Sequence, residues 1–293
     1  MRGREGSGLV RGVACGIVGA TLATALGATP GSAAQTEAAM PFLPHQALYD
    51  LSLVKSRRSP SVDAVQGRIA YTFAGSACEG YTTEFRQVSR IEAGEGEPKL
   101  SDLRSISWED GAGKSYRFHI ETRMDNAIAK VVDGEAEQGA KGVVVRLKQP
   151  NKKTVTLDAS TVFPTEQVRR ILAAARAGKS LLELVVYDGS DNGEKLYNTL
   201  AVIGPAVPGD RATGKPDITG ADSRLHKLTR WPVTVSYYDR SEESGKGEQT
   251  PVYAMSFELY ENGVSRALTF DYNDFVVGGV MTRYDPQAAK PCK

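Results

Sequence analysis

The chain has 293 residues, with 36 Lys and Arg against 35 Asp and Glu and a formal net charge of +1. Because the positive and negative charges are nearly equal in number, the composition gives no argument for binding to nucleic acid or to a strongly anionic surface. With 41% hydrophobic residues, the chain is long enough for one large domain or two small ones with ample core.

The N-terminal residues have the three parts of a secretory signal peptide. Three arginines and one acid occupy residues 1–11, residues 12–28 carry no charge, and the small residues Ser32, Ala33 and Ala34 precede Gln35. A membrane anchor is the alternative, but the uncharged run is short and rich in Gly, Ala and Thr. We therefore expect an exported protein: a signal peptide over residues 1–34 cleaved near Ala34, a flexible tether over 35–41, and one domain over 42–293.

Cysteine counting yields one candidate bridge. Cys15 leaves with the signal peptide, so the mature chain keeps Cys78 and Cys292. Two thiols in an oxidising compartment usually form one disulfide. Two unpaired thiols or an intermolecular bridge remain the alternatives at this point.

Alternating apolar residues predict antiparallel strands through the first half of the mature chain. Ala47, Tyr49, Leu51 and Leu53 share one face, which is the period of a half-buried strand. The same pattern predicts strands at 69–73, 81–85, Arg104–Glu109, Tyr116–Arg123, Ala127–Val132, Val143–Lys148 and Lys153–Leu157.

One helix interrupts the strands between Thr165 and Gly178. Its apolar residues, Val168, Ile171, Leu172 and Ala175, recur with helical spacing on one face. Thr165 is predicted to cap its start and Gly178 to end it. So narrow a stripe predicts a helix that lies against the sheet or plugs one end of a barrel.

Strands resume after the helix. Leu181–Tyr187 and Lys195–Ile203 flank a turn-rich segment and predict a hairpin. A long loop is expected from Pro205 to about Asp222, a strand at Trp231–Tyr238, and an exposed loop at Ser241–Gln249.

Asn262-Gly263, between two alternating runs, favours a two-residue type I′ turn. This turn predicts four facing pairs: Leu259 with Arg266, Phe257 with Leu268, Met255 with Phe270, and Tyr253 with Tyr272. At least a dozen strands and one helix make the protein mostly β. So many strands must curl, close into a barrel or stack, and a curled sheet partly covered by a helix leaves an apolar cleft.

No residue pattern identifies a reaction. The nucleophile elbow and phosphate loop motifs are missing, no cofactor motif is found, and the scattered histidines lack zinc-ligand spacing. His45 is interpreted as a structural histidine at a strand entrance. The aromatic side chains of the C-terminal strands are interpreted as core, with a cleft lining as the alternative: Tyr237, Tyr238, Tyr253, Phe257, Phe270, Tyr272 and Phe275.

Several segments, in order along the mature chain, resemble the EipB family of periplasmic cell-envelope integrity proteins of Gram-negative bacteria. The segments are Leu43-Pro44-His45, Cys78-Glu79-Gly80-Tyr81, Trp108-Glu109-Asp110-Gly111, Phe163-Pro164-Thr165, Val186-Tyr187-Asp188-Gly189-Ser190 and Glu261-Asn262-Gly263-Val264-Ser265-Arg266. The resemblance implies a periplasmic location and a single long antiparallel sheet wound into an open barrel or spiral. It also implies a disulfide between Cys78 and Cys292, which occupy the places of the family's disulfide cysteines.

The family's architecture is similar to that of periplasmic lipid and lipoprotein carriers, so Val168, Ile171 and Leu172 become candidates to cover a cleft. The expected function is a non-enzymatic role in envelope integrity, with no cofactor, through binding of an amphiphilic ligand or an envelope partner protein. The alternative is a periplasmic hydrolase of an envelope polymer that uses Glu109, Asp110, Asp271 and Asp274.

Overall fold

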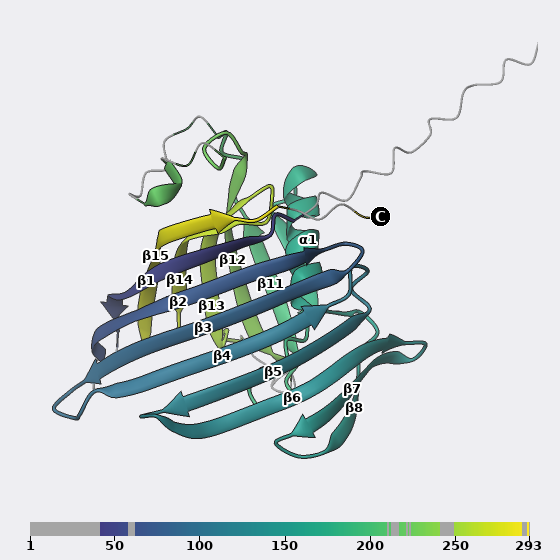
Figure 1. The fold of residues 1–293 in the computed structure, drawn as a ribbon, viewed down its shortest axis with the longest axis horizontal. Helices are drawn as coiled ribbons and strands as arrows, with labels where there is room; N and C mark the ends of the chain where they lie inside the picture. The colour runs from purple at the N-terminus through teal and green to yellow at the C-terminus, as the bar shows by residue number, and fades with distance from the viewer. Residues whose placement is uncertain are drawn as a thin grey trace, which may run out of the picture. The chain divides into compact units, whose positions relative to one another are not determined.

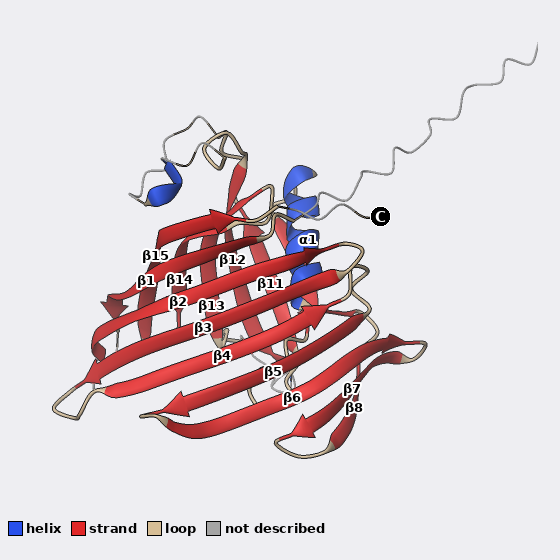
Figure 2. Cartoon of the chain, viewed as in Figure 1, coloured by secondary structure: helices blue, strands red, loops and turns tan. Residues whose placement is uncertain are grey.

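The computed structural model describes residues 42–57, 62–209, 211, 217–220, 222, 224–240, 249–288 and 292. The predicted signal peptide, the predicted tether and residues 241–248 of the predicted exposed loop lie outside the described residues. Strands dominate the described part of the chain, with a single α-helix beside them (Figure 2).

Among the described residues, fifteen strands form one sheet. The elements are β1 (His45–Ser56), β2 (Val62–Ser76), β3 (Gly80–Ala93), β4 (Lys99–Glu109), β5 (Ser115–Met124), β6 (Ala127–Gly139), β7 (Gly142–Gln149), β8 (Lys153–Leu157), β9 (Thr161–Val162), α1 (Pro164–Arg176), β10 (Leu181–Val186), β11 (Tyr197–Ile203), the 3₁₀ turn η1 (Ile218–Gly220), β12 (Arg230–Asp239), β13 (Tyr253–Tyr260), β14 (Ser265–Asp271) and β15 (Phe275–Pro286). The order across the sheet is β8-β7-β6-β5-β4-β3-β2-β1-β15-β14-β13-β12-β11-β10-β9.

Pairing of the first strand with the last makes this order possible. Strands β1 and β15 run antiparallel, with Tyr49 facing Met281 and Leu51 facing Gly279. On either side of this pair, chain neighbours pair with each other out to the two ends of the sheet. The sheet curls so that the strands before and after the helix face each other (Figure 1), and it nearly closes into a barrel. The predicted fold class, a mostly β protein with a single curled sheet and one helix, is confirmed.

The curl leaves a seam between β8 and β9. In the described part of the chain, β8 pairs only with β7, and β9 pairs only with β10. Side chains cross the seam instead: the Gln138 amide donates to the Thr161 carbonyl at 2.7 Å, and Lys130 pairs with Asp191 at 2.9 Å. The barrel is therefore closed by backbone ladders everywhere except at the seam.

Helix α1 packs on the inner face of β10 and β11. Ile171 and Leu172 lie in a core with Trp231, Val235 and Leu259, whose side chains are at most 6% exposed. This packing fills one half of the curled sheet with apolar side chains.

The helix begins differently from the prediction and ends as predicted. Phe163 occupies the N-cap position, Pro164 is the first helical residue, and the Phe163 side chain makes no capping hydrogen bond. Thr165 is therefore not the cap. Gly178, with φ of +69°, follows the C-cap residue Ala177, where a left-handed conformation favours glycine.

The predicted two-residue turn at Asn262-Gly263 is wrong. The N–H of Tyr260 donates to the Val264 carbonyl at 2.8 Å, and the N–H of Gly263 donates to the Tyr260 carbonyl at 2.9 Å. The loop therefore has three residues, 261–263, and Gly263 takes a φ of +87°. Three-residue hairpins with glycine in this conformation are a common alternative to the two-residue turn.

The extra residue shifts the ladder near the turn by one position, so Leu259 does not face Arg266 as predicted. A bulge follows, and Ala267 there has a φ of +52°. Beyond the bulge Met255 faces Phe270, as predicted.

Arg266 therefore pairs with Glu258 across the ladder and not with Leu259, and its side chain is fully buried. Its guanidinium donates to Asp217 at 2.7 Å and to Glu258 at 2.7 Å. Asp217 precedes η1, and η1 packs beside β15. The segment that was predicted to be a long loop thus carries a buried ion pair that anchors it to the sheet.

Candidate functional site

A cavity of about 650 Å³ lies inside the curled sheet. Such a volume falls in the range of small-molecule binding sites. Its lining comes from the inner faces of β1 to β6, the start of α1, the β10–β11 turn and the β13–β14 hairpin: Phe42, Leu43, His45, Tyr71, Phe73, Thr83, Phe85, Leu103, Ser105, Ser107, Glu109, Tyr116, Ile120, Thr122, Ala129, Lys130, Pro164, Thr165, Val168, Asp188, Ser190, Asp191, Met255, Asn262 and Gly263.

The wall contributed by β4 combines apolar and hydroxyl side chains. Leu103, Ser105 and Ser107 alternate along the strand and point inward, where they are only half-buried because they face the cavity. Ile106, between the two serines, points outward and is 55% exposed. Around Ile106 the usual amphipathicity is therefore reversed, with the hydroxyl groups of Ser105 and Ser107 inside and an isoleucine outside.

Glu109 joins the cavity wall to the helix. It ends β4 and is 2% exposed. Its carboxylate accepts the backbone N–H groups of Thr165 at 2.7 Å and Glu166 at 2.9 Å. Burial raises the pKa of Glu109 to about 7, and these two hydrogen bonds oppose the shift. Glu109 thus caps α1 from a distant strand, a role that the local sequence around the helix does not reveal.

Asp188 and His45 are among the other titratable groups that line the cavity. Asp188 follows β10, and its carboxylate accepts the backbone N–H of Ser190 at 2.9 Å, while burial raises its pKa. His45 begins β1, its Nδ1–H donates to the Leu43 carbonyl at 2.8 Å, and burial lowers its pKa. His45 is 2% exposed at the strand entrance, which agrees with its interpretation as a structural histidine.

The three helix residues that were proposed to cover a cleft have different surroundings. Val168 lines the cavity. Ile171 and Leu172 are not part of its lining and instead pack in the core beside β11 and β12. The helix therefore turns one residue of the predicted set toward the cavity and two toward the packed half of the sheet.

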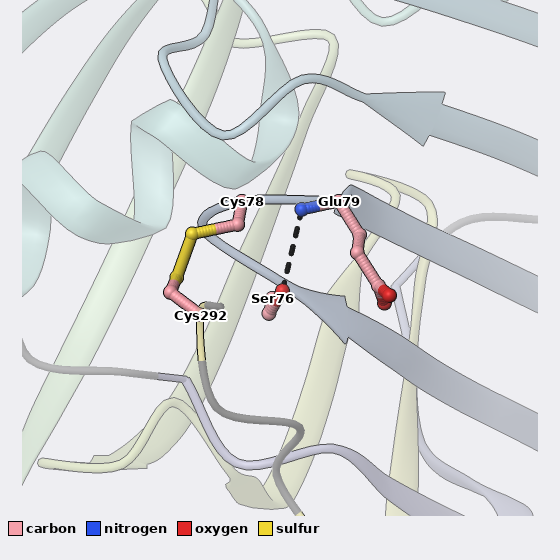
Figure 3. The surroundings of a disulfide bond; sticks show 4 residues. All are labelled: Ser76, Cys78, Glu79 and Cys292. Atoms are coloured by element: carbon pink, nitrogen blue, oxygen red, sulfur yellow. Dashed lines mark hydrogen bonds between the residues drawn. A yellow bond between two sulfur atoms is a disulfide. The ribbon is translucent and has the colours of Figure 1, made fainter.

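A disulfide joins Cys78 to Cys292, with the two Cα atoms 5.7 Å apart (Figure 3). Cys78 lies in the turn between β2 and β3, next to the cavity-lining strands. The indole N–H of Trp108 donates to the Glu79 carbonyl in the same turn, at 3.2 Å. The bridge therefore attaches the chain beyond β15 to one rim of the cavity wall.

The acids of the hydrolase alternative have structural partners. Glu109 caps the helix, and Asp110 accepts the backbone N–H of Ser115 at 2.8 Å. Asp271 pairs with Arg57 through a 2.8 Å contact. Asp271 and Asp274 flank the β14–β15 turn and are not among the cavity-lining residues. The four acids therefore do not share one site.

The aromatic side chains of the C-terminal strands also lie outside the cavity lining. Tyr237 and Phe257 are buried in the core with α1, and Phe270 and Phe275 pack against a second core built on β1, β2 and β15. Tyr237 and Tyr253 stack with ring centroids 4.5 Å apart. These contacts place Tyr237, Phe257, Phe270 and Phe275 in or against the core, as interpreted, whereas Tyr272 is 37% exposed and Tyr238 is half-buried.

Among the described residues, no cluster of three or more His, Cys, Asp or Glu side chains could hold a metal ion. No helix there is long and apolar enough to cross a membrane.

Comparison with known proteins gives consistent matches. The EipB-like family model matches residues 36–287. The cell envelope integrity protein EipB of Brucella abortus (strain 2308) is 34% identical over 255 residues, which cover 86% of this chain and 87% of that protein. A crystal structure of a β-barrel-like protein of a domain of unknown function, also from Brucella abortus, superposes with a TM-score of 0.76. It has 33% identity and covers 84% of this chain and 99% of the solved one.

Proposed function

The chain belongs to the EipB-like family, and from this premise we propose that it is an exported, non-enzymatic protein that supports the integrity of the cell envelope. We further propose that it does so by binding an amphiphilic ligand in the cavity of its curled sheet. The supporting relative is a protein named for cell envelope integrity. The signal-like N-terminus supports export to the periplasm.

The cavity is the observation that carries the binding proposal. A sheet that only served as a scaffold would be expected to fill its interior to the density of a protein core. Here the inner residues of β4 and the facing apolar side chains, such as Phe85 and Ile120, leave about 650 Å³ open. Apolar walls interrupted by a few hydroxyl and carboxyl groups suit a ligand with an alkyl part and a polar part.

Adjacent residues on β4 give a matched pair of variants that tests this proposal. Ser105→Phe places a ring inside the cavity, whereas Ile106→Phe adds a ring of the same size on the outer face. We expect the Ser105 variant to lose binding of a neutral fluorescent naphthylamine probe, and the Ile106 variant to bind it as the unmodified protein does. Circular dichroism and thermal melting establish that both variants are folded.

The cellular readout is resistance to detergent in a strain that depends on this protein. Failure of Ser105→Phe to restore resistance, with full restoration by Ile106→Phe, is the expected result. If both variants restore resistance, the cavity is not required, and binding of an envelope partner protein on another surface becomes the favoured mechanism.

The non-enzymatic part of the proposal rests on the structural engagement of the candidate acids. Complementation with Glu109→Gln, Asp110→Asn, Asp271→Asn and Asp274→Asn tests it separately. Loss of envelope resistance in a stable, exported variant at any of these positions would revive the hydrolase alternative.

A further inference from the structure

Asp188 is a carboxylate in the cavity wall that forms no ion pair among the described residues. One of its carboxylate oxygens, Oδ1, accepts the Ser190 N–H at 2.9 Å. Within the described residues, no Lys, Arg or His side chain forms an ion pair with Asp188. The carboxylate also has hydrogen bonds to the Ser190 side chain and to its own backbone, so in the cavity wall it has hydrogen-bond donors but, among the described residues, no neutralising cation.

The other acids of the lining are already engaged. Glu109 accepts two N–H groups at the start of α1. Asp191 pairs with Lys130 at 2.9 Å and with Lys195 at 3.0 Å. An unpaired, largely desolvated carboxylate is costly, and a cation that approaches it recovers part of this cost. Because the positive end of α1 offsets the charge of Glu109, Asp188 is the acid of the lining that neither a lysine nor a helix terminus neutralises.

A tyrosine holds the backbone of Asp188 in place. The Tyr116 hydroxyl donates to the Asp188 carbonyl at 3.0 Å and holds the β10–β11 turn against β5. Tyr116 is itself stacked on Phe118 and Phe163, with ring centroids 5.4 Å and 5.2 Å apart. This packed aromatic cluster therefore fixes the place of Asp188 in the cavity wall.

The cavity lining has no unpaired positive charge that could bind a negatively charged head group. Lys130 is the lysine of the lining, and Asp191 already neutralises it. His45 has its pKa lowered by burial, and it is therefore neutral at pH 7. A carboxylate or phosphate buried here would meet acids and no available cation among the lining residues.

Building on the proposed function, we propose that the cavity selects amphiphiles whose buried head is a positively charged amine or ammonium group, and that Asp188 pairs with this group. The alkyl part of such a ligand would lie along Phe85, Leu103 and Ile120 on the inner faces of β3 to β5. The cavity thus distinguishes cationic from anionic amphiphiles of the same chain length.

A head-group series with a constant alkyl chain tests the proposal on the unmodified protein. Dodecylamine, dodecanol, dodecanoate and dodecyl phosphate are titrated as competitors of the naphthylamine probe at neutral pH, below their micellar concentrations. We expect dodecylammonium to bind roughly tenfold or more tightly than dodecanoate, because an adjacent opposite charge is worth one or more pKa units. Equal or tighter binding of dodecanoate or dodecyl phosphate would overturn the inference and leave the proposed function intact. Failure of all four to bind would instead count against the proposed function.

Two substitutions in the same turn region assign the selectivity to one carboxylate. Asp188→Asn removes the charge at the cavity wall, whereas Glu194→Gln removes a charge that pairs with Lys153 and is not part of the lining. We expect Asp188→Asn to reduce the preference for dodecylammonium over dodecanoate to about twofold or less, with dodecanol binding unchanged. Glu194→Gln should keep the full preference. An unchanged preference in Asp188→Asn, with dodecanol binding as evidence of an intact cavity, contradicts the assignment.

Discussion

In both halves of the sheet, side chains alternate between the inner and the outer face, but the inner faces meet different surroundings. On β12 and β13 the inward side chains pack against α1, and Val235 and Leu259 are each 1% exposed. On β4 the inward side chains Leu103, Ser105 and Ser107 face the cavity and are half-buried. One curled sheet thus has a half packed around α1 and a half that is packed in part around β5 to β7 but leaves the cavity open at β4. The helix makes the difference, because it lies against only one of the two.

Among the predicted changes, removal of the disulfide should lower the stability of the protein most. The bridge closes a loop with a sequence separation of 214 residues, for which the chain-entropy model gives up to ~5 kcal/mol. We expect Cys292→Ser to lower the melting temperature in oxidising buffer, and the unmodified protein with reductant to melt at a similar temperature. Hydrogen exchange should rise first in β2 and β3, which flank Cys78. Labelling of both cysteines by an alkylating reagent without reductant would show that the bridge is not formed in solution.

A matched pair of leucine substitutions compares the two halves directly. Leu259→Ala removes a side chain from the packed half and should cost roughly 2–5 kcal/mol of unfolding free energy, because it leaves a void in a dense core. Leu103→Ala removes the same atoms from the cavity wall and should cost less than about 1 kcal/mol. Urea denaturation measures both values. Equal costs would mean that the cavity half is as tightly packed as the helix half.

The third prediction concerns Glu109, which lies where the two halves meet. Its pKa is raised to about 7 in the folded chain, so its contribution to stability is fully present below its ordinary pKa near 4.5. That contribution is lost as the pH rises through 7. We expect the unfolding free energy of the unmodified protein to fall by roughly 1–3 kcal/mol more than that of Glu109→Gln between pH 5 and pH 8. Parallel pH profiles would contradict the raised pKa, and Glu84→Gln, an exposed acid on β3, is the control.

The strands were predictable wherever one face is apolar and the other polar. Ala47, Tyr49 and Leu51 alternate in this way and fall in β1, and the β10–β11 hairpin pairs as expected. Strand β9, with two residues, is too short to give a period. The bulge at Ala267 also left no signal, because its left-handed residue is neither glycine nor asparagine.

An apolar cleft was predicted from the curled sheet and its helix, but the residues that line the cavity could not be predicted, for a different reason. Its serine residues on β4 read as a solvent-facing side, and Ile106 reads as a core residue, yet their positions are reversed in the structure. Only the placement of α1 decides which part of the inner face is filled. The capping of α1 by Glu109 joins residues more than fifty positions apart, which no local motif records.

Pairing of β1 with β15 has a consequence for how the molecule acquires its structure. The two partners are separated by more than two hundred residues, as in the pairing of Leu51 with Gly279. During synthesis β1 is made first and must wait for β15 before its second edge is covered. Folding rates fall as contacts become more distant in sequence, and an uncovered strand edge is prone to pair with other chains. Pairing of β15 with β1 is therefore expected to be a slow step of folding. Until it occurs, the open edge of β1 can pair with other chains, and a chaperone that covers this edge would prevent aggregation.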